Sequence, residues 1–471
     1  MRTLVWFRND LRVNDHPALI HAMEQGDVVA VFCLCVRQWR SHDVGDNRLA
    51  FLLDSLHQLA ADLRALGVPL RLIEEPWFEG LPGALVKLAQ SLDAGALAFN
   101  EEYPLNERVR DSKVTRACDA AGIAVHAHHA AALLPPGTVL TNDRAPYTVF
   151  SPFKRRWLDR ISPAAHEALP KPRPQRRPEV EDSDLPAQLD GAARDRVSAL
   201  WPAGAREAQR RLTVFIEERA ARYKDDRNFP SVDGTSTLSP YLSIGSISAR
   251  TCLQAAVAAN EGHLRTGNPG LLTWIDELIW RDFYRHVIAQ FPHVSQGQAF
   301  RREIDAMPWR HAPEEFAAWQ AGQTGYPLVD AAMRQLTETG WMHNRLRMVT
   351  AMFLSKHLLL DWRLGERHFM NHLVDGDFAA NNGGWQWSAA TGTDAAPYFR
   401  IFNPNTQAER FDPKGEFIRR YVPELRDAPP KALFDPAAHR VPGYPRPMVE
   451  HKLARERALA TFKSVKNADP G

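Results

Sequence analysis

The chain has 471 residues, of which 44% are hydrophobic and 24% charged, and its formal net charge is +2. This length allows two or three domains with buried cores, and the composition is typical of a soluble globular protein. A net charge near zero neither indicates nor excludes nucleic acid, because binding requires a local basic face. No run approaches the roughly 20 apolar residues of a membrane helix, and the charged start MRTLVWFRNDLR does not resemble a signal peptide. We therefore expect no membrane partner.

The four cysteines predict neither a disulfide nor a metal site. Cys33 and Cys35 alternate along an expected strand, so they would share one face of it. Neither they nor Cys118 and Cys252 form a CxxC pair or a Cys/His cluster with zinc spacing. Such thiols are typical of a protein core in a reducing compartment. We therefore expect a cytoplasmic protein without disulfides and without a bound metal.

The first third of the chain alternates short apolar runs with helical patterns. Four runs have the composition of buried strands: Thr3–Phe7, Val28–Val36, Pro69–Glu74 and Ala96–Asn100. Three stretches are candidate helices: Arg48–Leu66, Gly80–Leu92 and Asn106–Ala121. This alternation predicts a Rossmann-like, doubly wound parallel sheet over residues 1–130. The turn after the first strand reads RNDLRVND rather than GxGxxG, so the usual dinucleotide fingerprint is absent.

Residues 131–202 are expected to form a long linker. Within them Pro163–Pro202 is rich in proline and charge without periodicity, and its RRP cluster is typical of a solvated surface. From residue 203 to 471 the pattern predicts an all-helical domain, with helices at Arg206–Asp226, Leu271–Ala289, Tyr326–Thr339, Asn344–Leu360 and Glu366–Val374. Because one chain holds all the motifs described below, a monomer is expected.

Three segments of the helical domain suggest either ordinary packing or a ligand site. The loop Asp233–Ser246 is rich in Gly, Ser and Thr, which suits phosphate binding but also turn and capping chemistry. The helix Leu271–Arg285 places an apolar stripe on one face and Trp274, Glu277, Arg281 and Tyr284 on another. The segment Trp341–Met348 combines Asn344 and Met348, one turn apart, with two arginines. Each pattern also fits a helix or loop without a ligand.

The strongest signal is the segment Asp375–Trp387, DGDFAANNGGWQW. It is too polar and glycine-rich for a core helix and too aromatic for a plain loop. Eight of the 13 tryptophans fall between Trp274 and Trp387, which indicates a role for these rings beyond packing. Paired asparagines and aspartates that can hydrogen-bond a heterocycle, with glycines that permit close approach, predict a cofactor site.

These segments, read in order, resemble those of a known family. GTSTLS, WIDELIWRDFYRH, WMHNRLRM, DGDFAANNGGWQW and TGTDAAPYFRIFNP are similar to segments of the photolyase/cryptochrome family, and LVWFRNDLRVNDHPAL is similar to its N-terminal strand and turn. The similarity runs from about residue 3 to about residue 450 and is closest to microbial class I cyclobutane pyrimidine dimer photolyases. It implies a light-driven DNA repair enzyme with an α/β domain and an all-α domain.

The resemblance implies that the helical domain binds FAD, with the reduced form active. The phosphate and ribitol contacts would come from Tyr223, Thr235, Ser236, Thr237, Leu238 and Ser239, with Trp274 at the wall of the pocket. Asp375, Gly376 and Asp377 would contact the flavin and adenosine parts. Asn381 would face flavin N5, where a neutral amide can accept from a protonated nitrogen and favours reduced flavin. Plant and animal cryptochromes carry Asp or Cys there, so Asn381 favours repair over signalling.

The resemblance also implies roles in electron transfer and DNA binding. Trp385, Trp362 and Trp309 match the family's electron-transfer chain, although without the neighbouring motifs they would be interpreted as core tryptophans. The dimer, flipped out of the duplex, would stack on Trp280 and Trp387. It would also contact Glu277, Asn344 and Met348, and Glu277 would stabilise the radical anion of the dimer. Four arginines would grip phosphates without reading sequence: Arg227, Arg281, Arg345 and Arg400.

Three alternatives to dimer repair are expected to fail. Enzymes that repair (6-4) photoproducts carry histidines where this chain has Asn344 and Met348, and His343 points elsewhere on the helix. Signalling cryptochromes commonly carry long C-terminal extensions, for which VEHKLARERALATF leaves no room before the end of this sequence. A light-independent flavoprotein with merely packed tryptophans is a third, weaker reading.

The antenna chromophore is less determined by the residues. Asn106 and Glu107 match the family's folate contacts, which favours methenyltetrahydrofolate. Ser295 and Gln296 stand where the closest relatives have a cysteine and a lysine in the inter-domain cleft. This departure leaves 8-hydroxydeazaflavin, or no antenna at all, as alternatives.

Overall fold

The computed structural model describes residues 2–162, 167–192 and 194–468. Its residues form two compact units that do not follow the chain order. Unit 1 consists of residues 1–221, 236–292 and 374–376, and unit 2 of residues 222–235, 293–373 and 377–471. The boundaries near residues 130 and 203 therefore stay predictions, because unit 1 contains helices on both sides of them.

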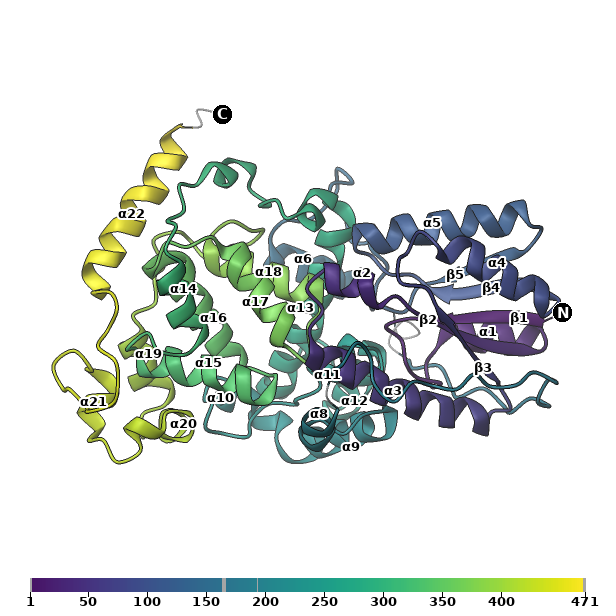
Figure 1. Ribbon diagram of the computed structural model, residues 1–471, viewed down its shortest axis with the longest axis horizontal. Coiled ribbons are helices and arrows are strands. Elements are labelled where there is room, and N and C mark those ends of the chain that lie inside the picture. The colour runs from purple at the N-terminus through teal and green to yellow at the C-terminus, as the bar shows by residue number, and fades with distance from the viewer. Residues whose placement is uncertain (1, 163–166, 193, 469–471) are drawn as a thin grey trace. The chain divides into compact units, whose positions relative to one another are not determined.

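The predicted parallel sheet is present in unit 1 (Figure 1). Its strand order is β3-β2-β1-β4-β5, and every adjacent pair is parallel. The strands are β1 (Arg2–Phe7), β2 (Val28–Leu34), β3 (Leu70–Glu74), β4 (Ala94–Asn100) and β5 (Ala124–His128). The order reverses between β1 and β4, as in a doubly wound fold, which confirms the predicted fold class. Among the described strands only β5 was not predicted, because its sequence AVHAH has a single large apolar residue and lies at the sheet edge.

Helices cover both faces of this sheet (Figure 1). They are α1 (Pro17–Gln25), α2 (Val36–Ser41), α3 (Asp46–Ala65), α4 (Leu81–Ser91) and α5 (Leu105–Ala120). α4 and α5 pack on the face that carries Leu4 and Trp6, together with the thiols of Cys33 and Cys35. All four cysteines are buried and free, as predicted for core thiols.

The remainder of unit 1 is helical. Its helices are α6 (Phe150–Arg160), α8 (Asp195–Leu200), α9 (Ala205–Glu218), α11 (Ser239–Ser243), α12 (Ala249–Ala259) and α13 (Pro269–Gln290). The predicted linker, residues 131–202, contains the helices α6 and α8, so it is not extended throughout. Its described residues 167–192 form no helix or strand, and there the Gln175 amide bonds the backbone of Val28 and Gly67. The short helices η1 (Ala220–Arg222) and η2 (Pro292–Gln296) lie where the chain passes between units.

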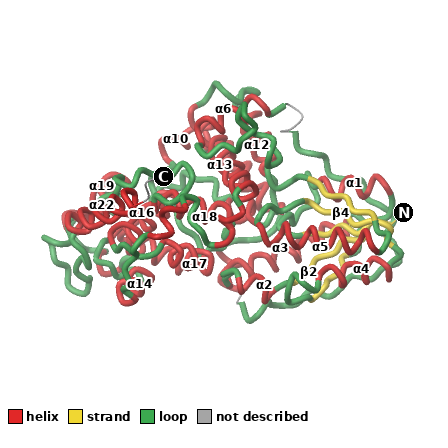
Figure 2. Tube along the Cα trace, turned by 90° about the horizontal axis from the view of Figure 1, so that it is seen from above, coloured by secondary structure: helices red, strands yellow, loops and turns green. Residues whose placement is uncertain are grey.

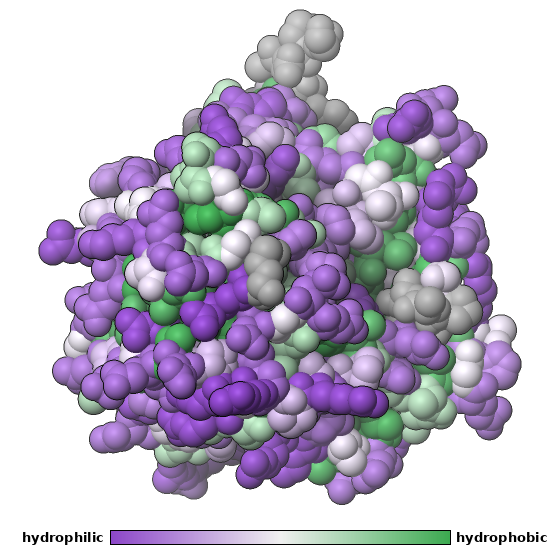
Figure 3. Space-filling model, turned by 90° about the vertical axis from the view of Figure 1, so that its right-hand side faces the viewer, coloured by the Kyte–Doolittle hydropathy of each residue, from purple (hydrophilic) through white to green (hydrophobic). Residues whose placement is uncertain are grey.

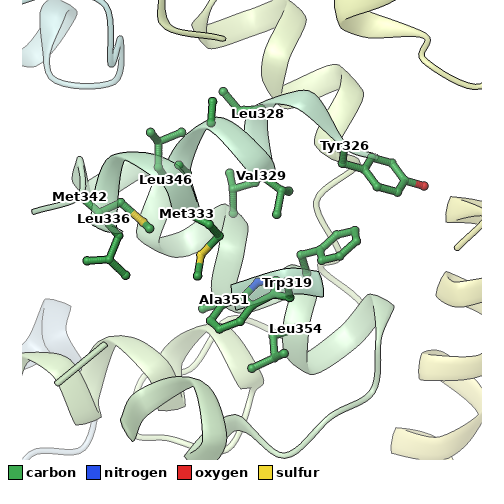
Figure 4. Close-up of a cluster of buried hydrophobic side chains, with 14 of the residues drawn as sticks. Trp319, Tyr326, Leu328, Val329, Met333, Leu336, Met342, Leu346, Ala351 and Leu354 are labelled. Atoms are coloured by element: carbon green, nitrogen blue, oxygen red, sulfur yellow. The ribbon is translucent and has the colours of Figure 1, made fainter. Parts of the chain in front are cut away.

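Unit 2 contains no strand among its described residues, in agreement with the predicted all-helical character (Figure 2). Its helices are α10 (Tyr223–Asp226), η3 (Arg302–Ala306), α14 (Pro313–Gln320), α15 (Pro327–Thr339), α16 (Asn344–Met352), η4 (Phe353–His357), α17 (Trp362–His372), α18 (Phe378–Ala389), α19 (Pro404–Phe411), α20 (Glu416–Tyr421), η5 (Pro423–Leu425), α21 (Pro430–Phe434) and α22 (His451–Ala468). Figure 4 shows its core, in which Met333, Ala351 and Leu354 gather near Trp319.

Three helix predictions need correction. The expected helix Arg206–Asp226 ends its first part at Glu218 and is divided into α9, η1 and α10. The expected helix Asn344–Leu360 ends its α-helical part at Met352 and continues as the π-helical turn η4. The segment Asp375–Trp387, read as neither core helix nor plain loop, forms α18 from Phe378 onward. Packing against α16 and α17 outweighs the low helix propensity of its Asn and Gly residues.

No helix of the described residues is long and apolar enough to cross a membrane. The face in Figure 3 is mostly hydrophilic, with apolar side chains in small scattered areas. Such scattered areas are normal for a protein surface and need no partner to cover them.

Candidate active site

The segment NNGGWQW is held in place by a network of side-chain amides. Asp377 caps α18 by accepting from the backbone N–H of Ala380 at 3.0 Å. The Asn382 amide donates to a carboxylate oxygen of Glu366 at 2.8 Å, and its own oxygen accepts from Gln386 at 2.9 Å. These bonds fix α18 to α17, and they explain why a segment of low helix propensity is helical.

Asn381 lies in this network with a defined orientation. Its Nδ2 donates to the backbone oxygen of Glu366 at 3.1 Å, and 8% of the residue is exposed. Because Nδ2 is engaged by that carbonyl, the Oδ1 of the same amide is turned the other way as a hydrogen-bond acceptor. The residue therefore presents the acceptor that the predicted contact with a protonated flavin nitrogen requires.

The three predicted electron-transfer tryptophans belong to unit 2. Trp385 on α18 and Trp362 on α17 are buried in one core cluster, and Trp309 packs against that cluster while partly exposed. Trp319, in the same cluster, has its ring centroid 6.1 Å from that of Trp385. Closely packed indoles that run from a buried to a partly exposed ring suit stepwise electron transfer.

Trp385 and Trp387 leave α18 in different directions. Two residues correspond to about 200° around a helix, so their side chains lie on nearly opposite sides. Trp385 is buried, whereas Trp387 is partly exposed. This agrees with the interpretation that the first serves the redox chemistry and the second the substrate.

The predicted lesion contacts Asn344 and Met348 lie on the accessible side of α16. Asn344 is exposed and Met348 partly exposed, whereas Leu346 and Val349 are buried. His343 caps this helix, accepting from the N–H of Arg345 at 3.2 Å, and is buried. Burial, with Arg345 and Arg347 nearby, lowers the pKa of His343 to about 4. A buried, neutral histidine agrees with the prediction that it takes no part in acid–base work on the substrate.

Arg227 and Arg345, both predicted phosphate contacts, are close together in unit 2. Arg345 donates to the Oδ1 of Asn228 at 2.7 Å, and its guanidinium lies 4.5 Å from the Phe411 ring centroid. The guanidinium of Arg410 lies 5.2 Å from the same centroid. Burial lowers the pKa of Arg345, and the charges of Arg227 and Arg410 lower it further. Cations gathered in this way favour an anion such as a phosphate.

Arg400 lies in the exposed loop that precedes α19. Its backbone oxygen accepts from the Nζ of Lys356 at 2.9 Å, and burial with the nearby Arg400 lowers the pKa of that lysine to about 7. The neighbouring Phe399 is 60% exposed, an unusual position for a phenylalanine. This loop therefore presents a cation and an apolar ring side by side.

Helix α13 carries the unit 1 candidates. Glu277 and Trp280 are partly exposed, and Trp280 stacks on Phe150 with centroids 3.7 Å apart. One face of the Trp280 indole is therefore covered by protein, as in a rigid stacking wall. Arg281 donates to the backbone oxygens of Ala131 and Leu242 at 2.6 and 3.3 Å, which gives it a structural function besides its predicted phosphate contact.

Trp274 was predicted to form part of the wall of a ligand pocket. It is buried, with its ring centroid 4.8 Å from that of Phe215. The apolar stripe was predicted correctly, since Ile275, Leu278 and Ile279 are buried. A role for Trp274 beside the cofactor stays a prediction.

The loop predicted to bind phosphate has strained backbone. Thr237 has φ +50°, an uncommon value for a β-branched residue that costs energy. Its hydroxyl donates to the Ser236 oxygen at 2.8 Å and accepts from Arg211 at 2.9 Å. Arg211 therefore adds a positive charge to this loop, although it also pairs with Glu207 at 2.8 Å.

The other predicted cofactor residues lie in both units. Tyr223 begins α10, with the Arg227 guanidinium 5.7 Å from its ring centroid. Asp375 and Gly376 belong to unit 1, whereas Asp377 belongs to unit 2. Asp375 is buried, as expected of a carboxylate that contacts a ligand or a backbone donor.

The predicted antenna residues lie in the first turn of α5, directly after β4. Asn106 is exposed, and its amide lies 3.0 Å from the Nε2 of His42. Burial and the carboxylate of Glu102 raise the pKa of Glu107 to about 7, although Arg110 opposes this shift. The carboxyl end of β4 is where the strand order reverses, which is the usual ligand position in such sheets.

Several residues of these groups were not identified from the sequence. Arg211 and Arg410 stand outside the quoted motifs, and only spatial proximity reveals them. The sequence gave no indication that Glu366 contacts Asn381, because the two residues lie in different helices, 15 positions apart in the chain. A phenylalanine next to an arginine in a loop is the one local signal that could have identified Phe399.

Comparison with known proteins agrees with this geometry. Residues 3–175 match the family model described as DNA photolyase, and residues 274–464 match the FAD-binding domain of DNA photolyase. The chain belongs to the DNA photolyase family. It is 43% identical over 470 residues to the deoxyribodipyrimidine photo-lyase of Salmonella typhimurium, which covers 98% of each chain.

Solved structures of the family have the same fold. A class III photolyase from Agrobacterium tumefaciens matches with a TM-score of 0.89 and 34% identity, covering 99% of this chain and 98% of that chain. A cryptochrome from Synechocystis matches with a TM-score of 0.84 and 28% identity, covering 98% and 99%. Because photolyases and a cryptochrome share this fold, repair must be argued from the site.

Proposed function

We propose that this protein is a deoxyribodipyrimidine photolyase, which uses blue light to split cyclobutane pyrimidine dimers in DNA. The observation that carries the proposal is the Asn381 amide, whose Nδ2 is engaged by Glu366 so that Oδ1 is available as an acceptor. The similarity over 98% of the chain to a curated enzyme of that name supports the same conclusion.

The residues fit FAD as the cofactor. They supply an oriented amide for a flavin nitrogen, a strained hydroxyl-rich loop with Arg211 for phosphates, and buried indoles. Reduced FAD, when bound, would absorb the blue light and supply one electron to the dimer. The dimer would return that electron after its two cyclobutane carbon–carbon bonds break. The net reaction is therefore neither an oxidation nor a reduction.

The tryptophans keep the cofactor reduced. Trp385 gives up an electron first and is re-reduced by Trp362, which is re-reduced by Trp309 in turn. Trp309 is the partly exposed member, so an external reductant can restore it. The packing of the three indoles in one cluster of unit 2 supports this proposed order of transfers.

The accessible side chains of α13 and α16 are assigned to the lesion. Trp280 and Trp387 would stack on the flipped bases, with roughly 1–3 kcal/mol per base available from such stacking. This offsets much of the few kcal/mol that unpairing costs. Glu277 and Asn344 would hydrogen-bond the dimer, and Met348 would supply an apolar contact. Arg227, Arg345 and Arg400 would hold phosphates and position the DNA without reading sequence.

Methenyltetrahydrofolate is our proposal for the antenna. Glu107 at the reversal of strand order can accept hydrogen bonds from the N–H groups of a pterin ring. An absorption spectrum of the chromophore extracted from purified protein would identify it; a deazaflavin spectrum, or none, would reject folate.

A blue-light photoreceptor is the second candidate function, because a cryptochrome shares the fold. Asn381 favours repair over this alternative, since a neutral acceptor amide stabilises the reduced state that repair requires. We further propose that the protein acts as a monomer in the cytoplasm.

One assay separates these functions. DNA containing cyclobutane dimers is incubated with protein and reductant, in blue light and in the dark, and restored pyrimidines are counted. The proposal expects restoration in light alone. No restoration in light favours the photoreceptor, and restoration in the dark favours a light-independent flavoprotein.

A further inference from the structure

Gly365, in the middle of α17, is the point at which the indole ring of Trp385 rests on the helix backbone. A Cβ atom built on Gly365 would lie 2.1 Å from Cη2 and 2.5 Å from Cζ3 of Trp385, and 2.6 Å from Cδ2 of Leu354. Carbon atoms in contact lie about 3.5–4.0 Å apart, so these separations are too short for any side chain. Only glycine admits the ring at this position.

The backbone conformation does not explain the glycine. Gly365 lies inside an α-helix and is not among the residues with positive φ. In a helix interior glycine costs about 1 kcal/mol relative to alanine. The close approach of the Trp385 ring is therefore the physical reason for glycine here.

The neighbours of Gly365 along α17 belong to the same electron-transfer region. Trp362 precedes it by three residues and Phe369 follows it by four, so all three lie on one face of the helix. The Phe369 ring contacts Trp385 edge-on, with centroids 4.9 Å apart and planes at 79°. The Trp385 ring thus lies over Gly365, next to the helical face that carries Trp362.

Packing rather than hydrogen bonding orients these two indoles. Among the described residues no group accepts from the Nε1 of Trp385 or Trp362. The Nε1 of Trp319, by contrast, donates to the Thr350 oxygen at 3.3 Å. A ring held by packing alone moves when the surface beneath it changes.

We infer that Gly365 is a positioning residue of the electron-transfer chain, because its missing side chain sets how closely the Trp385 ring approaches α17 and Trp362. This inference rests on the proposed function of the tryptophans. Electron transfer between rings slows steeply with distance, so a methyl group that pushes Trp385 away from α17 slows the transfer from Trp362.

The test compares Gly365→Ala with two single variants and one double variant. Trp385→Phe removes the ring atoms nearest Gly365, Gly365→Ala/Trp385→Phe combines both changes, and Gly83→Ala is the control. Gly83 lies in α4, where an added Cβ meets nothing within 4 Å. Each FAD-loaded protein is measured for its thermal unfolding temperature, light-driven reduction of oxidised FAD, and repair after chemical reduction.

We expect Gly365→Ala to slow light-driven reduction severalfold and to lower the unfolding temperature, while chemically reduced protein still repairs DNA. Gly83→Ala should leave light-driven reduction and repair unchanged and should not lower the unfolding temperature, because alanine is favoured over glycine in a helix. In the Trp385→Phe background, adding Gly365→Ala should lower the unfolding temperature much less, because the smaller ring leaves room for the methyl group.

Two results would overturn the inference, and they differ from failure of the proposed function. Normal light-driven reduction in Gly365→Ala, together with its loss in Trp385→Phe, rejects the positioning role alone. Normal reduction in both variants rejects the electron-transfer chain as well. If Gly365→Ala is too unstable to purify, a double variant that is equally unstable shows that the contact with Trp385 is not the cause.

Discussion

The Nδ2 of Asn381 donates to the backbone oxygen of Glu366 at 3.1 Å, which joins α18 to α17 and decides which end of the amide is available. Its Oδ1 is thereby left as a hydrogen-bond acceptor, which the proposed contact with a protonated flavin nitrogen requires. The same short stretch of α17 holds Asn382 through the Glu366 carboxylate and carries Gly365 beneath Trp385. One turn of α17 therefore determines the positions of Asn381, the proposed cofactor contact, and of Trp385, the proposed first electron donor.

Replacing Asn381 with aspartate should disfavour reduced flavin. The new carboxylate would repel the anionic reduced cofactor and would lose the donor to Glu366. A like-charge contact at about 4 Å costs roughly 1–4 kcal/mol near a protein surface. Since about 59 mV corresponds to a factor of ten for one electron, the midpoint potential should fall by roughly 40–170 mV. Spectroelectrochemistry measures this shift, with the exposed Asn142→Asp as control; an unchanged potential would remove Asn381 from the flavin.

Trp309→Phe should separate cofactor reduction from repair. Phenylalanine keeps much of the packing against the core but is far harder to oxidise than indole. Light-driven reduction of oxidised FAD should slow strongly, whereas chemically reduced protein should repair at the normal rate. Transient absorption and a repair assay measure the two steps separately. Equal loss of both would mean that Trp309 acts through structure alone.

Arg410→Gln should weaken DNA binding uniformly across sequences, because Arg410 belongs to the cation group around Phe411. Loss of one phosphate contact should reduce the slope of log affinity against log salt by about 0.9. The titration is repeated with Arg265→Gln, whose side chain is exposed and paired with Asp159. An unchanged slope for Arg410→Gln would place the phosphates elsewhere.

Antenna binding should depend on pH through Glu107. Its pKa is raised to about 7, chiefly by burial and the Glu102 carboxylate, so the group is neutral below that pH and charged above it. A pterin donates N–H groups, which bind the carboxylate better than the acid. Folate occupancy should therefore rise as pH increases through about 7, and Glu107→Gln should remove that dependence. Chromophore absorbance at several pH values measures it, with the exposed Glu79→Gln as control; identical profiles for wild type and Glu107→Gln would reject this role.

The sequence predicted the elements that have strong periodicity and missed those that depend on context. The four apolar strands were found, whereas β5 was not, because its sequence AVHAH has a single large apolar residue and lies at a sheet edge. The helix α18 was not recognised, since its Asn and Gly residues disfavour a helix unless neighbouring helices support it. Helical spacing separates Trp274 from the apolar stripe of α13, but it does not reveal that Phe215 packs against the Trp274 ring.

The residues of the site that lie in unusual sequence motifs could be predicted, whereas the residues that position them could not. Asn381 and Trp385 lie in a segment whose composition is unusual in itself. Glu366, Gly365 and Arg410 act through contacts with residues distant in sequence, and a single sequence holds no record of those contacts. Their functions follow only from distances in the folded chain.

Flash excitation of the chemically reduced protein, bound to DNA that contains a cyclobutane dimer, tests the central claim most directly. The absorbance of reduced flavin should fall after the flash and return without added reductant. After the same flash the ultraviolet absorbance of restored pyrimidines should rise. DNA without a dimer should show neither this rise nor the loss and recovery of flavin absorbance that the dimer causes. Restored pyrimidines without any change in the flavin, or a flavin that never recovers, would contradict the account.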